Sequence, residues 1–222
     1  MASLNTVLLA LDTSSAAVTV AVTDDGHVRA ESTTLDARRH TELLAPAIVD
    51  TLSRAGVSRS DLTAIAVGIG PGPFTGLRIG LATARMLGLT LGVPVHGVCS
   101  LDVIAADVPP DGPFVVVTDA RRREVYWASY AGRAVGDAPV ARTQGPMVVP
   151  PADVATELPA AGAGARLYPQ AFPRAIAPEY PSAATLARAV TAGLVETRPP
   201  EPLYLRRPDA RPPGERKRVL TR

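Results

Sequence analysis

The sequence predicts an α/β fold, and three features of the chain support that prediction. Apolar runs at residues 7–11 and 64–68 have the length and composition of strands that are buried on both faces of a sheet. Residues 38–55 and 75–91 have the apolar periodicity of helices. A hairpin pattern near the N-terminus also recurs after a constant shift. Alternating strands and helices are typical of an α/β architecture.

The chain is expected to begin with a hairpin. Residues 7–11 form its first strand, and the polar turn at 12–15 has side chains that hydrogen-bond their own backbone. Residues 18–22 form the return strand, and Asp25 with Gly26 marks a second tight turn. These signals predict antiparallel strands at the start of the sheet.

A helix is predicted over residues 38–55. Leu44, Ile48 and Leu52 recur at a spacing of four, so they share one face. Pro46 lies inside this range, which predicts either a kink or a helix that begins later than residue 38.

The remainder of the first half continues the alternation. A strand at 64–68 leads through a loop rich in glycine and proline into a helix at about 75–91. The next strand is predicted at 93–98. Ser100 then caps a helix that runs to Ala106.

The second half repeats this pattern on a smaller scale. The Pro/Gly-rich residues 109–113 mark a boundary. Strands are predicted at 114–118 and 125–130, around the polar turn at 119–124. Residues 182–195 have a helical apolar pattern.

These patterns divide the chain into three parts. Residues 1–108 form a first subdomain, and 109–205 form a smaller second subdomain whose last helix returns to the first. Residues 138–181, rich in Pro, Ala and Gly, give only weak assignments. Residues 206–222 are basic and are expected to be disordered.

The two hairpins align as an internal repeat. Chance is one explanation, because hairpins are common, but we favour a duplication that produces two related halves around a cleft. A shift of 107 residues pairs Asp12 with Asp119, Val18 with Val125, Val20 with Trp127, Ala21 with Ala128, and Val28 with Val135.

Composition excludes several classes of site. Cys99 is the only cysteine, so an intrachain disulfide is impossible, and with three histidines no metal site is expected. The only lysine is Lys217, which excludes a P-loop and Schiff-base chemistry in the body of the chain. No signal sequence or membrane span is predicted, so we expect a cytoplasmic protein.

The helix at 75–91 carries small residues at a spacing of four. Gly76, Gly80, Ala84 and Gly88 form this stripe, and helical glycine costs about 1 kcal/mol relative to alanine. Close approach of another element explains such a stripe. Two interpretations remain: burial within one domain, or one face on the sheet and another on a partner subunit. The preceding glycine-rich loop is either a phosphate-binding loop or a tight connection, and the tight connection is slightly favoured.

Several segments together resemble the TsaB family of tRNA-modification proteins. The most specific is the loop and helix start VGIGPGPFTGLRIG at 67–80. Other matching segments are LALDTS at 9–14, RHTELLAP at 39–46, DARRREVY at 119–126 and PLYLR at 202–206. The resemblance covers nearly the whole chain.

The resemblance implies an actin-like ATPase (ribonuclease H-like) fold with two related subdomains, the second reduced. It implies a non-catalytic scaffold without a cofactor, which supports a TsaD-like catalytic subunit and works with a TsaE-like ATPase. That machinery places threonylcarbamoyl on N6 of adenosine 37 of tRNAs that read codons beginning with A. The isolated chain is expected to form a homodimer, to contact tRNA indirectly or weakly, and to avoid membranes.

Two groups of residues carry these expectations. The early helices form the partner interface, and the first turn is a relic of a phosphate site. The relic site comprises Asp12, Thr13 and Ser14. The expected interface comprises His40, Leu44, Ile48, Gly76, Ile79, Gly80, Thr83, Ala84 and Leu87.

Catalysis by the chain itself is not expected. The catalytic paralogue has two metal-binding histidines, and alignment places Ser100 and Ile104 at those positions. Serine is a poor ligand for iron or zinc, and isoleucine is none. The alternative is an active ATPase, sugar kinase or glycoprotease-like peptidase. Asp102 and Asp119 are the available acids, and neither has an evident partner.

A further alternative is direct RNA binding by the basic segment Arg216, Lys217 and Arg218. Basic tails are usually only solvated. No aromatic residue interleaves with these charges, as a stacking platform for bases requires.

Overall fold

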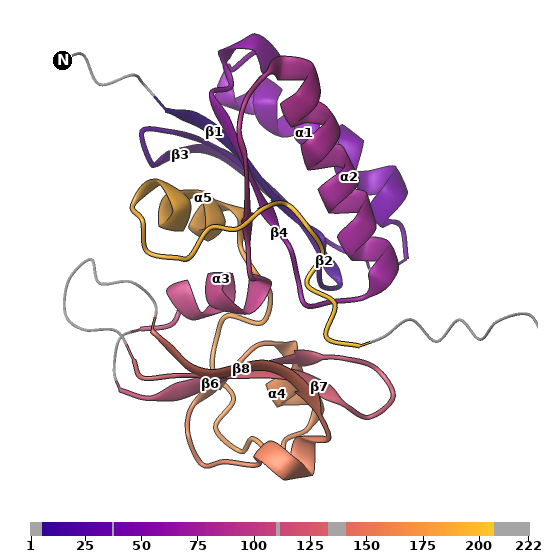
Figure 1. Ribbon diagram of the computed structural model, residues 1–222, viewed down its shortest axis with the longest axis vertical. Helices are drawn as coiled ribbons and strands as arrows, with labels where there is room; N and C mark the ends of the chain where they lie inside the picture. The colour runs from indigo at the N-terminus through magenta and orange to yellow at the C-terminus, as the bar shows by residue number, and fades with distance from the viewer. Residues whose placement is uncertain (1–5, 37, 110–111, 133–140, 207–222) are drawn as a thin grey trace, which may run out of the picture.

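The computed structural model describes residues 6–36, 38–109, 112–132 and 141–206. The chain forms two β-sheets, one above the other, with helices between and around them (Figure 1). The predicted segment 206–222 lies outside the described residues except for Arg206. No helix in the described ranges is long and apolar enough to cross a membrane.

The first sheet has the strand order β3-β2-β1-β4-β5. Its strands β1, β2 and β3 pair antiparallel, whereas β4 and β5 run parallel to β1. This is the ribonuclease H-like arrangement that the resemblance implies. The strands are β1 (Val7–Asp12), β2 (Ala17–Asp24), β3 (His27–Leu35), β4 (Ala64–Gly68) and β5 (Val95–Val98).

Helices cover both faces of this sheet (Figure 1). Helices α1 (His40–Ala55) and α2 (Phe74–Leu91) lie on one face, and α5 (Ala183–Thr191) lies on the other. Successive side chains of β1 point to opposite faces of the sheet, so the strand contributes to the cores on both faces. Leu9 and Leu11 join the core beneath α1 and α2, whereas Leu8 and Ala10 join the core beneath α5.

The second sheet has the order β8-β7-β6-β9 and repeats the first four strands of the first sheet. Helix α3 (Ser100–Ala106) packs on one of its faces, and α4 (Ala163–Leu167) packs on the other. The α/β fold with two related halves, the second reduced, is therefore confirmed. The strands are β6 (Phe114–Asp119), β7 (Val125–Tyr130), β8 (Arg142–Val149) and β9 (Ala160–Ala161), and the short 3-10 helices of the chain are η1 (Arg59–Asp61) and η2 (Pro151–Val154).

The constant shift of the internal repeat holds for the first strand of each hairpin and fails for the second. Strand β6 follows β1 by 107 residues along its whole length. Asp12 pairs with Thr19, but Asp119 pairs with Val125, so the second turn is one residue shorter. The equivalences of Val18 with Val125, Val20 with Trp127 and Ala21 with Ala128 are therefore each wrong by one position. Val135, expected to match Val28, lies outside the described residues. The physical reason is a tighter turn, closed by a hydrogen bond from the Ala120 N–H to the Glu124 carbonyl.

Element boundaries differ from the predictions at three places. Helix α1 begins at His40 and keeps Pro46 inside, so the later start is correct. Helix α5 ends at Thr191, because Gly193 adopts a left-handed φ of 66° soon after it. Residues 138–181, weakly assigned from sequence, contain β8, η2, β9 and α4. Helix α5 packs against β1 and β2 of the first sheet.

The glycine stripe of α2 packs against the chain's own first turn. A Cβ atom at Gly76 would overlap the Thr13 carbonyl oxygen, and one at Gly80 would overlap Thr13 Oγ1. Gly88 faces Val95 in the same way. Of the two interpretations of the stripe, burial within one domain therefore accounts for its glycines. Gly76, Gly80 and Ala84 are buried and form no outward surface.

We expect Gly80→Ala to destabilise the fold by about 1–3 kcal/mol, because the added methyl group overlaps Thr13. In an open helix the same change would stabilise by about 1 kcal/mol. Urea unfolding measures the sign. Ala82→Gly, at an exposed position of the same helix, is the control and should lose about 1 kcal/mol from propensity alone. A more stable Gly80→Ala variant would contradict this packing.

Candidate functional site: the cleft between the two sheets

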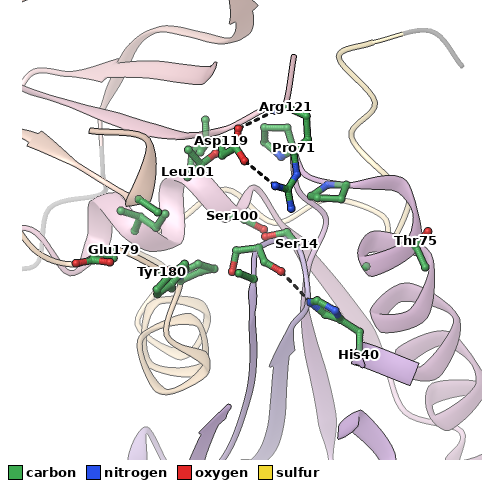
Figure 2. A pocket seen from close by; sticks show the side chains of 18 of the residues that line it. Ser14, His40, Pro71, Thr75, Ser100, Leu101, Asp119, Arg121, Glu179 and Tyr180 are labelled. Carbon is green, nitrogen blue, oxygen red and sulfur yellow. Dashed lines mark hydrogen bonds and ion pairs between the residues drawn. The ribbon is translucent and has the colours of Figure 1, made fainter. Parts of the chain in front are cut away.

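A cleft of about 650 Å³ lies between the two halves of the chain. Its floor comes from the turn after β1 and from the start of α3, which contributes Ser100 and Ile104. The start of α1 contributes His40, and the loop after β4 contributes Pro71. Side chains from all these elements converge in Figure 2. The carboxyl ends of β1, β4 and β6 lead into the cleft, where open α/β sheets commonly bind ligands.

Asp12 lies beneath the cleft floor and is completely buried. Its Oδ1 accepts a hydrogen bond of 2.7 Å from the Ser14 N–H. Its Oδ2 accepts one of 2.7 Å from the Ser100 hydroxyl. Gly68 is required beside this carboxylate, because a Cβ atom there would overlap Oδ2. Both oxygens are therefore engaged by the chain's own donors.

Burial raises the pKa of the Asp12 carboxyl, and the hydrogen bonds from Ser100 and Ser14 oppose that rise. Ser100 links the carboxylate to the neighbouring loop, because its Oγ also accepts a hydrogen bond of 3.1 Å from the Gly70 N–H. The Ser100 N–H donates in turn to the Gly70 carbonyl at 2.7 Å. Ser100, expected from sequence to occupy a metal-binding histidine position of the catalytic paralogue, thus links Asp12 to the Gly70 loop.

The other two residues of the predicted relic phosphate site are both buried, but only one of them lines the cleft. Thr13 is buried and its hydroxyl donates to the Gly76 carbonyl at 2.7 Å. Ser14 lines the cleft. The glycine-rich loop closes on this turn, because a Cβ atom at Gly72 would overlap the Ser14 carbonyl oxygen. This contact makes the loop a tight connection, the interpretation favoured from sequence. Phosphate binding at the trio stays a prediction.

The residues predicted for the partner interface separate into two groups. The buried members are His40, Leu44, Ile48, Gly76, Gly80 and Ala84. Those that remain half-buried are Ile79, Thr83 and Leu87. His40 is 2.8 Å from the Ser15 carbonyl oxygen through Nε2, which donates the hydrogen bond (Figure 2).

The predicted interface residues do not include the most exposed apolar side chains of α1 and α2. Val49 is 67% exposed, Met86 is 61% exposed and Leu89 is 79% exposed. These three side chains are not among the buried residues of their helices, so they face solvent. The signal was available: large apolar residues that fall outside the predicted core face mark an unpartnered surface.

Ion pairs occupy the polar walls of the cleft. Arg121 contacts Asp119 at 3.3 Å (Figure 2). Arg166 contacts Glu179 at 2.6 Å. Asp119 therefore has a partner that sequence reasoning did not identify. Among the described residues, no group of three or more His, Cys, Asp or Glu side chains could hold a metal ion.

The second acid considered from sequence, Asp102, joins α3 to the second sheet. Both of its carboxylate oxygens lie 3.0 Å from Arg142 Nη1, and Tyr130 donates its hydroxyl to Oδ1 at 2.8 Å. The view that Asp102 lacks a partner is therefore wrong. Burial raises the pKa of the neighbouring Cys99 thiol to about 12, so this thiol stays protonated and unreactive.

Comparisons with known proteins agree with this geometry. The family model described as TsaD, tRNA N6-adenosine threonylcarbamoyltransferase, matches residues 28–206. YeaZ from Pseudomonas aeruginosa superposes with a TM-score of 0.74 at 31% identity, covering 90% of this chain and 100% of that one. An uncharacterised protein of Mycobacterium tuberculosis (strain H37Rv) is 46% identical over 208 residues, 92% of this chain and 94% of its own.

A curated relative with a named role is the Escherichia coli K12 tRNA threonylcarbamoyladenosine biosynthesis protein TsaB, 41% identical over 126 residues. That match covers 55% of this chain and 54% of the relative. The matched region thus spans about half the length of this TsaB protein.

We expect Ser100→Ala to destabilise the protein by about 1–3 kcal/mol at neutral pH, with a smaller loss near pH 4. The Ser100 hydrogen bond lowers the pKa of folded Asp12, so its removal raises that pKa further above the unfolded value. Stability that depends on a raised carboxyl pKa is present at acidic pH and is lost as the pH rises through the folded-state value. Urea unfolding at the two pH values measures the difference.

The control for this variant is the double substitution Asp12→Asn with Ser100→Ala. It retains an oxygen for the Ser14 N–H and has no carboxyl group to titrate at position 12. Its stability should lack the additional loss between acidic and neutral pH. An equal loss at both pH values in Ser100→Ala itself would show that Asp12 does not titrate as described.

Proposed function

Because the chain belongs to the tRNA N6-adenosine threonylcarbamoyltransferase family, as a TsaB member, we propose that it is a non-catalytic subunit of the complex that installs threonylcarbamoyl on N6 of adenosine 37 of tRNA. Its partner is the TsaD-like catalytic subunit, and a TsaE-like ATPase works with both. The proposal locates the protein in the cytoplasm. A homodimer of the isolated chain would use the same surface as the catalytic partner.

The observation that carries the proposal is an exposed apolar face on α1 and α2. Both helices cover one side of the first sheet (Figure 1), so their outward faces point away from the body of the chain. We call this the helix-pair face and define it by Val49, Met86 and Leu89. Exposed patches of large apolar side chains mark protein–protein contact sites.

The state of the cleft supports a non-catalytic role. The two oxygens of Asp12 accept hydrogen bonds from Ser14 and Ser100, and the side chain does not line the cleft. Asp119 is paired with Arg121. Ser100 and Ile104 stand where the catalytic paralogue is expected to hold its metal, and hydroxyl and alkyl groups are poor ligands. Among the described residues that line the cleft, the two acids Asp119 and Glu179 are each paired with an arginine.

We expect Met86→Glu with Leu89→Glu to prevent co-purification with the TsaD-like subunit. Binding would remove the two new carboxylates from water without giving them a cation to pair with, and this costs binding free energy. Because both side chains are exposed, the unfolding midpoint should change little. Size-exclusion chromatography of the mixed subunits measures assembly.

The matched control is Val28→Glu with Leu35→Glu, at exposed apolar residues outside α1, α2 and the cleft. This control should assemble normally and support tRNA modification in the reconstituted reaction. If the Met86/Leu89 variant is folded and still assembles, the helix-pair face is not the interface.

A separate measurement tests the absence of catalysis. The isolated chain, supplied with ATP and magnesium, should hydrolyse no more ATP than its Asp12→Ala variant. ATP turnover by the isolated chain that Asp12→Ala abolishes would replace the scaffold proposal with an active ATPase.

A further inference from the structure

Three consecutive arginines form the turn between β6 and β7. Arg121, Arg122 and Arg123 have φ values of 62°, 56° and 60°, all in the left-handed region that glycine and asparagine adopt most readily. The Glu124 N–H donates to the Arg121 carbonyl at 3.0 Å and holds the turn. All three arginine residues are exposed. Strained backbone of this kind often marks a functional segment.

Two aromatic residues and two further arginines adjoin this turn. Beside it is a hollow of about 230 Å³ whose lining includes Arg121, Arg122, Phe74, Tyr204 and Arg206. The rings of Phe74 and Tyr204 lie 4.7 Å apart. Arg78 donates its Nε–H to the Tyr204 hydroxyl at 3.0 Å, and its guanidinium lies 5.6 Å from the centre of the Phe74 ring. We call this the arginine-turn surface: Arg78, Arg121, Arg122, Arg123, Tyr204 and Arg206.

The arginine-turn surface gathers five guanidinium groups. Asp119 pairs with Arg121, and Glu124 pairs with Arg206. Arg123 forms no ion pair with any residue that the structure describes.

We propose that the arginine-turn surface binds the phosphate backbone of the tRNA substrate, an inference that rests on the proposed function. Guanidinium groups bind phosphate oxygens through paired hydrogen bonds. Tyr204 is 38% exposed and adds an aromatic ring on which an unpaired base can stack. This combination fits RNA better than it fits an apolar protein surface.

The arginine-turn surface leaves the helix-pair face free. Both use α2, but Arg78 lies in the first half of the helix and Met86 in the second. Eight residues separate them, roughly 12 Å along a helix. The chain can therefore contact tRNA while the catalytic subunit occupies the other end of α2. Contacts with phosphates do not distinguish one base from another, so adenosine 37 must be recognised elsewhere in the complex.

The test measures binding of unmodified tRNA to the assembled complex, by fluorescence anisotropy over a range of salt concentrations. The variant is Arg122→Gln with Arg123→Gln in the full chain. The control, Arg29→Gln with Arg59→Gln, removes two exposed arginines near the end of the first sheet opposite the Asp12 turn. We expect the variant to lose roughly tenfold in affinity at low salt and the slope of log K against log salt to fall by about 1.5. The control should match the wild type.

A second variant separates binding from folding. Arg122→Gly with Arg123→Gly places glycine where φ is positive, so the turn should form without strain and the melting temperature should not fall below that of the Gln variant. Its affinity for tRNA should fall equally. Wild-type affinity and salt slope in both variants would overturn the proposal. So would weaker assembly with the catalytic subunit at unchanged tRNA affinity, because the surface would then be a protein interface.

The same assay distinguishes failure of this inference from failure of the proposed function. If the wild-type chain forms no complex with the TsaD-like subunit, the proposed function fails. If that complex forms and modifies tRNA while the Arg122 and Arg123 variants bind tRNA as the wild type does, only the RNA contact fails.

Discussion

The close contact between the first turn and a set of glycines determines the rest of this structure. The turn that follows β1 enters a space that exists only because Gly68, Gly72, Gly76 and Gly80 have no side chains. Thr13 then donates to the Gly76 carbonyl, and Ser100 donates to Asp12. One turn thereby joins β4, α2 and α3. Glycine has a low helix propensity, but each glycine of α2 permits a close contact that the Cβ atom of alanine would prevent.

This contact also has a consequence for chemistry. The turn holds Asp12 inside the fold, where both oxygens are hydrogen-bonded and no face of the carboxylate reaches the cleft. The fold therefore retains a cleft between two related halves, while the acid at its base has a structural role. The Asp102 carboxylate is likewise hydrogen-bonded, because it accepts from Arg142 and Tyr130, and these contacts join α3 to the second sheet.

Helix α2 combines three environments along a single element. Its glycine stripe contacts the first turn, its outward side presents Met86 and Leu89, and its first half presents Arg78 beside Tyr204. A rigid helix fixes the distance between an apolar surface and a basic surface. Rigid elements hold binding groups more accurately than loops do.

The sequence by itself determined the class of the fold, most elements of the first half and the family. Apolar periodicity and turn residues are local signals, and β1, β4, α1 and α2 depend on them. The sequence also identified the α2 stripe as a place of close approach. It could not decide what approached: the nearest atoms to a Cβ at Gly76 or Gly80 belong to Thr13 of the same chain. Only the tertiary structure brought Thr13 to a helix more than sixty residues later in the chain. It alone showed that Ser100 and Asp12 meet, and that Arg78, Arg122 and Tyr204 share one surface. Such meetings depend on how distant elements pack, and no local pattern encodes them.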